Sequence, residues 1–250
     1  MGAAVDIKLK IKRKDSSDSP FYWEEFNIPF RKNMNVISAL MEIQKNPVNA
    51  KGEKVRSVAW DYNCLEEVCG ACSMRINGKV RQACSTLVDR LEQPIYLEAM
   101  ETFPVEKDLV VNRDRMFSAL KKIKGWIPID GTYALGAGPL ISSDLQQEAY
   151  KYSTCMTCGC CLDACPNVNS GSPFIGPQAL GQTKYFNMHP TGAQQKNDRL
   201  SVMIGEEGLA NCGNSQNCVQ VCPKEIPLTT AIAELNKDAN RFALWSWLKR

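Results

Sequence analysis

The cysteines decide what chemistry this chain can do. Twelve of its 250 residues are cysteines, and residues 155–166 read C-x2-C-x2-C-x3-C-P once Cys160 is left out. This spacing lets three thiolates converge on one cubane iron–sulfur cluster while the fourth serves a second cluster. Pro166 fixes its own backbone angle and donates no N–H, so the chain turns away after the last thiolate. A zinc site or a disulfide cluster is the alternative, and the three matched gaps make it the weaker one.

A second cysteine motif completes these clusters, because the first motif leaves each of them short of ligands. Cys212, Cys218 and Cys222 keep the same template ahead of Pro223, and Ser215 stands where the second cysteine would be. Counting thiolates gives four for one centre and three for the other, which indicates one [4Fe–4S] and one [3Fe–4S] cluster. The four are Cys155, Cys158, Cys161 and Cys222, and the three are Cys165, Cys212 and Cys218. A second [4Fe–4S] cluster with the Ser215 oxygen on its fourth iron is disfavoured, since oxygen suits a soft iron–sulfide corner poorly.

A third motif lies in the first half of the chain. Its cysteines follow C-x4-C-x2-C with a later cysteine, which is the plant-type spacing for a [2Fe–2S] cluster. They are Cys64, Cys69, Cys72 and Cys84. Gly70 and Ala71 are small, so backbone N–H groups can approach the sulfurs. A structural zinc site with four cysteines is the alternative, but zinc ribbons usually carry two CxxC pairs and this loop has a single pair.

The bulk properties exclude several other classes of protein. A length of 250 residues suits one large or two modest domains, and a net charge of +3 is too small to argue for a nucleic-acid partner. The cysteines lie at metal-ligand spacing and no secretory signal precedes them. This favours metal-bound thiolates in a reducing compartment over disulfides in an oxidising one. No stretch approaches the ~18–20 apolar residues that cross a bilayer, so we expect any membrane attachment to come from a partner.

Hydrophobic periodicity and turn residues predict the elements that position the first cysteine loop. Strands are predicted over residues 5–14, 21–30, 74–76, 80–82 and 95–97, and a helix over 35–44. Asn33 or Asn35 is the candidate N-cap of that helix. The dipeptide Asn77-Gly78 predicts a tight hairpin, which would return Cys84 to the loop. This order of elements is typical of a β-grasp ferredoxin fold.

The second half is predicted to be mostly helical. Helices are predicted over residues 108–123, 144–152, 198–207 and 227–240, and Ser142 or Ser143 can cap the second of them. The aromatic and basic tail, residues 242–250, favours packing or a subunit contact over a lipid anchor. The fold class is therefore α+β. An N-terminal β-grasp, plant-type [2Fe–2S] ferredoxin domain is expected over 1–110, and a C-terminal all-α, bacterial-type ferredoxin domain with two cluster sites over 111–250.

No group in the sequence suggests that this chain transforms a substrate by itself. It has no nucleophile–base pair, no phosphate-cradling glycine loop and no G-x-G-x-x-G motif. Three clusters of different types have three different potentials, and a series of such clusters is typical of an electron wire. The wire must join a two-electron centre such as a flavin to an acceptor, and neither is expected in this chain.

The whole chain resembles the iron–sulfur subunit of succinate dehydrogenase and fumarate reductase. The resemblance rests on eleven cysteines in order, on Asp108-Leu-Val-Val111 and on Phe174-Ile-Gly-Pro177. It implies the three ligand sets given above, leaves Cys160 without a cluster and implies no catalytic residue in this chain. It also implies a flavoprotein partner with FAD and the dicarboxylate site at the [2Fe–2S] end, and a membrane anchor with the quinone at the [3Fe–4S] end.

Departures from the family pattern refine this expectation. Glu67 stands where many members have Gly, and we expect only a local effect. Members that reduce ubiquinone carry a Trp pair after the Cys-Pro and a His after the first cysteine of the second motif, whereas Asn167 and Gly213 stand at those places here. The chain thus resembles the menaquinone-linked branch, whose anchor is a diheme cytochrome b with heme b. We therefore expect the quinone to bind away from this subunit.

The resemblance predicts the electron-transfer subunit of a succinate:menaquinone oxidoreductase (succinate dehydrogenase, respiratory complex II), held at the cytoplasmic face of the cell membrane by a partner subunit. Electrons would pass from FAD through the [2Fe–2S], [4Fe–4S] and [3Fe–4S] clusters to heme and quinone. A fumarate reductase subunit that works in the reverse direction is the alternative within the same class. The alternative from another class is a zinc-stabilised binding module without redox activity.

Overall fold

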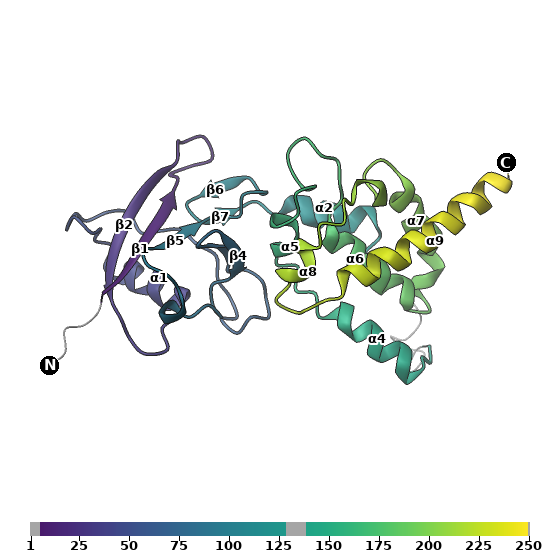
Figure 1. Cartoon of the computed structure of the whole chain (residues 1–250), viewed down its shortest axis with the longest axis horizontal. Helices are drawn as coiled ribbons and strands as arrows, with labels where there is room; N and C mark the ends of the chain where they lie inside the picture. The colour runs from purple at the N-terminus through teal and green to yellow at the C-terminus, as the bar shows by residue number, and fades with distance from the viewer. Residues whose placement is uncertain (1–5, 129–138, 250) are drawn as a thin grey trace. The chain divides into compact units, whose positions relative to one another are not determined.

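The computed structural model describes residues 6–128 and 139–249, which form two compact units (Figure 1). The first unit comprises Met1–Arg113 and Met156–Asp163, and the second comprises Asp114–Cys155 and Ala164–Arg250. The first ferredoxin-type motif is therefore divided between the two units. Most of it belongs to the N-terminal unit, and its two ends belong to the second unit. The domain boundary expected at residue 110 stays a prediction.

A five-stranded mixed sheet is the framework of the first unit (Figure 1). Its strand order is β2-β1-β5-β3-β4, with β1 antiparallel to β2 and parallel to β5, and with β3 antiparallel to both β5 and β4. The strands are β1 (Asp6–Arg13), β2 (Tyr22–Pro29), β3 (Ser73–Ile76), β4 (Lys79–Gln82) and β5 (Ile95–Glu98). All five predicted strands are confirmed within the described residues.

Alternation and capping explain how the sheet acquires its core. Ile7, Leu9 and Ile11 point to the buried face of β1, as a period of two requires. Helix α1 (Val36–Lys45) packs its apolar residues into the same core. Its predicted N-cap is confirmed, because the Asn35 Oδ1 atom accepts a hydrogen bond from the Ser38 N–H at 2.8 Å.

The predicted hairpin between β3 and β4 is also confirmed. Asn77 and Gly78 have φ angles of 49° and 74°, the two left-handed positions that a type I′ turn needs. A short 3-10 helix, Val88–Arg90, follows β4. The hairpin thereby brings Cys84 back to the cysteine loop that precedes β3.

The predicted helix over 108–123 is wrong in its first part. Residues Val105–Lys107 (β6) and Val110–Val111 (β7) form a small antiparallel ribbon, and the helix, α2 (Asp114–Lys122), begins only after it. The turn of the ribbon carries Asp108, which is fully buried and accepts hydrogen bonds from Arg56 at 2.8 Å and from Arg13 at 3.2 Å. This tertiary ion pair overrides the local helical pattern.

The second unit is helical, as predicted. Besides α2 its helices are α4 (Ser143–Ser153), α6 (Pro177–Met188), α7 (Lys196–Ile204), α8 (Asn217–Gln220) and α9 (Leu228–Leu248), with 3-10 turns at Gly192–Gln195 and Leu209–Asn211; the short α5 (Cys160–Asp163) belongs to the first unit. Ser142 caps α4, since its Oγ atom accepts from the Leu145 N–H. The predicted helix over 198–207 starts earlier and ends earlier, before Gly205.

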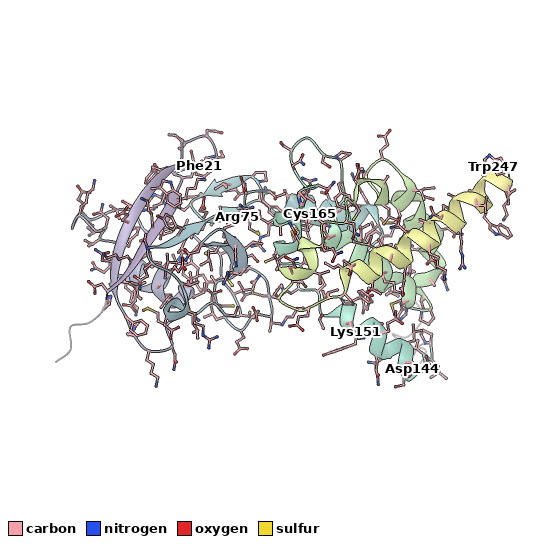
Figure 2. All side chains as sticks on the ribbon, in the orientation of Figure 1. Phe21, Arg75, Asp144, Lys151, Cys165 and Trp247 are labelled. Atoms are coloured by element: carbon pink, nitrogen blue, oxygen red, sulfur yellow. The ribbon has the colours of Figure 1, made fainter. Side chains whose placement is uncertain are left out.

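Two features of the second unit differ from the sequence prediction. Helix α6 was not predicted, because its first half is buried on nearly every side and shows no amphipathic period. Helix α9 runs about two turns further than predicted and packs on α6 and α7. No residue from 240 to 249 is buried, and Trp247 lies 70% exposed at the free end of the helix (Figure 2). Core packing of the tail is therefore wrong, and a subunit contact stays a prediction.

Helices long and apolar enough to cross a bilayer do not occur in the described parts of the chain.

We predict that Asp108→Asn lowers the stability of the first unit by about 1.5–3 kcal/mol, because it removes the buried carboxylate that accepts from Arg13 and Arg56, while Arg13 keeps its second anionic partner, Glu24. Burial alone would raise the pKa of Asp108, but hydrogen bonds from Arg56 and Arg13 outweigh it and keep this pKa below its ordinary value. The stabilisation is therefore complete above pH ~4 and is lost as the pH falls through the folded-state pKa. Thermal unfolding at neutral pH measures the effect. The exposed Asp18→Asn is the matched control, and equal midpoints for both variants would contradict the assignment.

Candidate iron–sulfur sites

The first cysteine loop presents backbone N–H groups to its own sulfurs. The Cys64 sulfur accepts hydrogen bonds from the N–H groups of Glu66, Val68 and Cys69 at 3.3–3.4 Å. The Cys69 sulfur accepts from the N–H of Ala71 at 3.5 Å. The bonds from Glu66 and Val68 lower the pKa of the Cys64 thiol to about 7. The loop therefore stabilises a thiolate, which is the form that binds a metal.

Left-handed residues turn these N–H groups inward. Leu65, Glu67 and Gly70 have φ angles of 62°, 56° and 72°. Glu67 thus occupies a conformation that favours glycine, which explains why glycine suits this place. Its side chain gains a contact in return, because the Ser85 hydroxyl donates to the Glu67 carboxylate at 2.5 Å. This departure from the family pattern has a local compensation.

The four cysteines of the first set come together as two pairs. Cys64 and Cys69 share backbone-to-sulfur and side-chain hydrogen bonds, and Cys72 contacts Cys84. A [2Fe–2S] cluster needs two protein ligands on each of its two irons, so this pairing fits the cluster. Burial, with the neighbouring Cys84 thiol, raises the pKa of Cys72 to about 12. In the first pair, the loop stabilises the thiolate of Cys64 before metal binds. In the second pair, Cys72 loses its proton when the metal binds.

The segment Met156–Asp163 packs directly against this loop within the first unit. A Cβ atom added to Gly70 would lie 2.7 Å from the Cα and Cβ atoms of Cys158. The Arg113 guanidinium donates to the Gly70 carbonyl at 2.9 Å and to the Ala71 carbonyl at 2.7 Å, and it reaches the Cys158 carbonyl at 3.5 Å. The loop of the predicted [2Fe–2S] site and the segment that carries Cys158 therefore lie in contact, and the Arg113 side chain binds carbonyl groups of both.

A buried ion pair anchors the far end of the same segment. The Asp163 carboxylate accepts from Arg75 Nε at 2.8 Å and from the Thr102 N–H at 3.0 Å. Sequence reasoning missed Arg75, Arg113 and Asp163, because no spacing rule marks a residue that binds a loop from elsewhere in the chain. The position of Asp163 inside the cysteine motif was the single available signal.

The predicted [4Fe–4S] ligands fall in both units. Cys158 and Cys161 belong to the first unit, while Cys155 and Cys222 belong to the second, so this set stays a prediction. Hydrogen bonding to Cys160 and burial raise the pKa of the Cys158 thiol. Cys160 itself is fully buried.

The third predicted set lies together in the second unit. Cys165, Cys212 and Cys218 line one hollow, and Ser215 lines it as well. The hollow is completed by Asn167, Phe174, Pro177, Gly213, Asn214, Gln216, Thr229 and Ile232. Burial, with the nearby Cys165 thiol, raises the pKa of Cys218 to about 11. The structure thus places the three thiols and the Ser215 hydroxyl around one hollow, and the ligand set itself stays a prediction.

Known proteins share these motifs. Residues 8–118 match the family described as 2Fe-2S iron-sulfur cluster binding domain, and residues 151–226 match the 4Fe-4S dicluster domain. The chain is 64% identical to the succinate dehydrogenase iron-sulfur subunit of Bacillus subtilis (strain 168), over 96% of this chain and 95% of that protein. The chain belongs to the family of succinate dehydrogenase and fumarate reductase iron–sulfur subunits.

More distant proteins resemble this chain in sequence or in fold. The fumarate reductase iron-sulfur subunit of Haemophilus influenzae is 28% identical over 90% of this chain and 89% of its own length. A chain of the Mycobacterium smegmatis Sdh1 complex in the apo form has the same fold, with a TM-score of 0.74 and 22% identity over 95% of this chain and 96% of that chain. The predicted α+β class and the two ferredoxin-type halves are confirmed.

We predict that Gly70→Ala reduces the amount of [2Fe–2S] cluster bound, because the new methyl group collides with the Cys158 backbone. Gly78→Ala is the matched control: Gly78 is also left-handed, at 74°, but an added Cβ meets nothing within 4 Å. Both variants bear the cost of a left-handed alanine, about 1 kcal/mol, and only Gly70→Ala has the collision. Iron per chain and the EPR signal of the reduced cluster report the difference, and equal losses in both variants would rule out the loop contact as the cause.

Proposed function

We propose that this chain is the electron-transfer subunit of a succinate:menaquinone oxidoreductase. It takes electrons from the FAD of a flavoprotein subunit and passes them to heme b in a diheme membrane anchor at the cytoplasmic face of the membrane. The observation that carries the proposal is the 64% identity to a succinate dehydrogenase iron-sulfur subunit over nearly the full chain. The two gathered cysteine groups in this structure support it.

The proposed ligand sets follow the sequence spacing. The [2Fe–2S] cluster binds Cys64, Cys69, Cys72 and Cys84; the [4Fe–4S] cluster binds Cys155, Cys158, Cys161 and Cys222; the [3Fe–4S] cluster binds Cys165, Cys212 and Cys218. Each cluster, when bound, accepts and releases one electron at a time. The protein's own part is to stabilise the thiolates through backbone N–H groups, as around Cys64, and to hold the loops at fixed positions.

The three-iron assignment is supported by the composition of its hollow. Three cysteines line it, and the residue at the fourth template position, Ser215, offers a hydroxyl. Thiolate is the softer ligand and suits an iron–sulfide corner better than oxygen does. The hollow therefore favours a cluster that lacks its fourth iron.

The exit for electrons is proposed to be a heme and not a quinone bound to this subunit. Asn167 and Gly213 beside the hollow supply no proton donor that titrates near neutral pH, and reduction of a quinone consumes protons. The exposed aromatic end of α9, which includes Trp245 and Trp247, supports a contact with a partner subunit. Menaquinone would then bind within the anchor.

Fumarate reduction is the second candidate, because several relatives at 26–28% identity are fumarate reductase iron-sulfur subunits. The much higher identity to a succinate dehydrogenase subunit favours succinate oxidation. A zinc-stabilised binding module is disfavoured by the match of both halves to iron–sulfur domains.

We predict that, in native membranes under anaerobic conditions, succinate reduces the [2Fe–2S] and [3Fe–4S] clusters and then a heme. EPR of the oxidised and the reduced complex measures the clusters, and visible spectra measure the heme. Turnover of succinate with a menaquinone analogue should exceed fumarate turnover in the same sample. A colourless purified chain would support zinc, a faster fumarate reaction would support the reverse direction, and a heme-free anchor would contradict the proposed exit.

We predict that Ser215→Cys converts the three-iron centre to [4Fe–4S], because a fourth thiolate completes the template within the hollow. The added anionic ligand should also lower the potential of this centre. Oxidised samples should lose the three-iron EPR signal, and the iron content should rise by one iron per chain. Ser215→Ala is the matched control and should keep the three-iron signal. Persistence of that signal in Ser215→Cys would show that the ligand count is wrong.

A further inference from the structure

Gln82, the last residue of β4, connects a proposed [2Fe–2S] ligand to the unassigned Cys160. Its side chain is 1% exposed. The amide oxygen lies 3.5 Å from the Cys72 sulfur, and the amide nitrogen lies 3.4 Å from the Cys160 sulfur and 2.7 Å from the Ser73 hydroxyl oxygen. All four residues belong to the first unit. A buried amide with this many partners is a specific feature, because an unpaired buried amide would be costly.

The hydrogen bonds around Gln82 change once Cys72 binds iron. The neutral Cys72 thiol can donate to the amide oxygen, but a metal-bound thiolate can only accept. An amide oxygen facing that anion would be repelled. Because the oxygen and the NH2 group of an amide have nearly the same shape, turning the amide over places an N–H toward the Cys72 sulfur without moving the backbone.

The neighbouring groups can follow this rotation. The turned amide oxygen faces Cys160 and Ser73, and both can donate to it, since a thiol and a hydroxyl each carry one hydrogen. Ser73 donates to the Gly70 carbonyl at 2.9 Å in the present arrangement. That carbonyl also accepts from Arg113 at 2.9 Å, so it stays paired when Ser73 turns to Gln82. The amide oxygen, the Ser73 hydroxyl and the Gly70 carbonyl therefore each keep a partner, and one N–H of the turned amide faces the Cys72 sulfur.

We propose that Gln82 tunes the [2Fe–2S] cluster by donating an N–H···S hydrogen bond to the Cys72 ligand, and that the Cys160 thiol holds the amide in this orientation. The inference rests on the proposed [2Fe–2S] site at Cys72. It gives a role to Cys160, which is fully buried yet belongs to no predicted ligand set. Cys160 is a positioning residue here and not a cluster ligand.

The hydrogen bond has a definite electrochemical consequence. Reduction adds negative charge to the cluster and its sulfurs, and a donor aimed at a ligand sulfur stabilises that charge. The reduction potential of the [2Fe–2S] cluster is therefore higher with Gln82 than without it. Clusters held by other cysteines do not share this bond.

The test is an EPR-monitored redox titration of the complete complex in membranes. Gln82→Leu removes the donor and should lower the [2Fe–2S] midpoint potential. The [3Fe–4S] midpoint should not move in this variant. Gln44→Leu, on the exposed side of α1, is the matched control and should leave all midpoints unchanged. Electron–nuclear double resonance should also lose an exchangeable proton coupling in Gln82→Leu.

The Cys160 variants separate positioning from packing. Cys160→Ser keeps a donor and should leave the [2Fe–2S] midpoint near that of the wild type, with all three clusters intact. Cys160→Ala removes the donor and should shift the midpoint downward, by less than Gln82→Leu does. If Gln82→Leu fails to assemble its [2Fe–2S] cluster, the comparison of Cys160→Ser with Cys160→Ala still tests the tuning role.

The outcomes distinguish this inference from the proposed function. A wild-type [2Fe–2S] signal with unchanged midpoints in Gln82→Leu, or in Cys160→Ala, would overturn the tuning role and leave the function standing. The absence of any [2Fe–2S] signal in the wild-type complex would overturn both. Loss of the [4Fe–4S] signal in Cys160→Ser would show that Cys160 is a ligand, which would also overturn the positioning role.

Discussion

The close approach of Gly70 to Cys158 is the contact on which the arrangement of the first unit depends. Two loops can meet this closely only where one has no side chain, and a Cβ on Gly70 would lie 2.7 Å from the Cys158 backbone. Arg113 then binds carbonyl groups of both loops. An electron-transfer subunit gains a fixed spacing between two cysteine loops in this way, because neither loop can move without breaking the arginine contacts.

Buried charges fix these loops where the hydrophobic core does not reach them. Asp108 and Asp163 are both buried, and each accepts hydrogen bonds from arginine and from a backbone N–H. A buried carboxylate with several donors holds a unique geometry, because any displacement leaves charge without a partner. The apolar core stabilises the sheet, and the ion pairs position the ribbon and the segment that carries Cys158.

The two gathered cysteine groups differ in how they are prepared for a cluster. The loop around Cys64 stabilises a thiolate by backbone N–H groups before any metal is present, as the lowered pKa of that thiol indicates. In the hollow of the second unit, burial raises the pKa of Cys218 to about 11. There the positive charge of the iron must compensate for burial, since metal binding deprotonates a thiol outright. The same holds for Cys72 in the first group, because burial raises its pKa to about 12. Both groups therefore depend on the metal for part of their thiolate charge, and the difference between them lies at Cys64.

The sequence by itself determined the five strands and the hairpin at Asn77-Gly78, because each depends on spacing or on a local backbone preference. It also predicted the cysteine sets and limited the helix cap to Asn33 or Asn35. Only the tertiary structure decided three other features. The first half of helix α6 is buried on nearly every side, so it has no hydrophobic period to detect. Residues Val110–Val111 form a strand because Asp108 pairs with distant arginines. Gln82 and Cys160 are 78 residues apart, and their contact at 3.4 Å depends on how the first motif packs against the sheet, which no local pattern encodes.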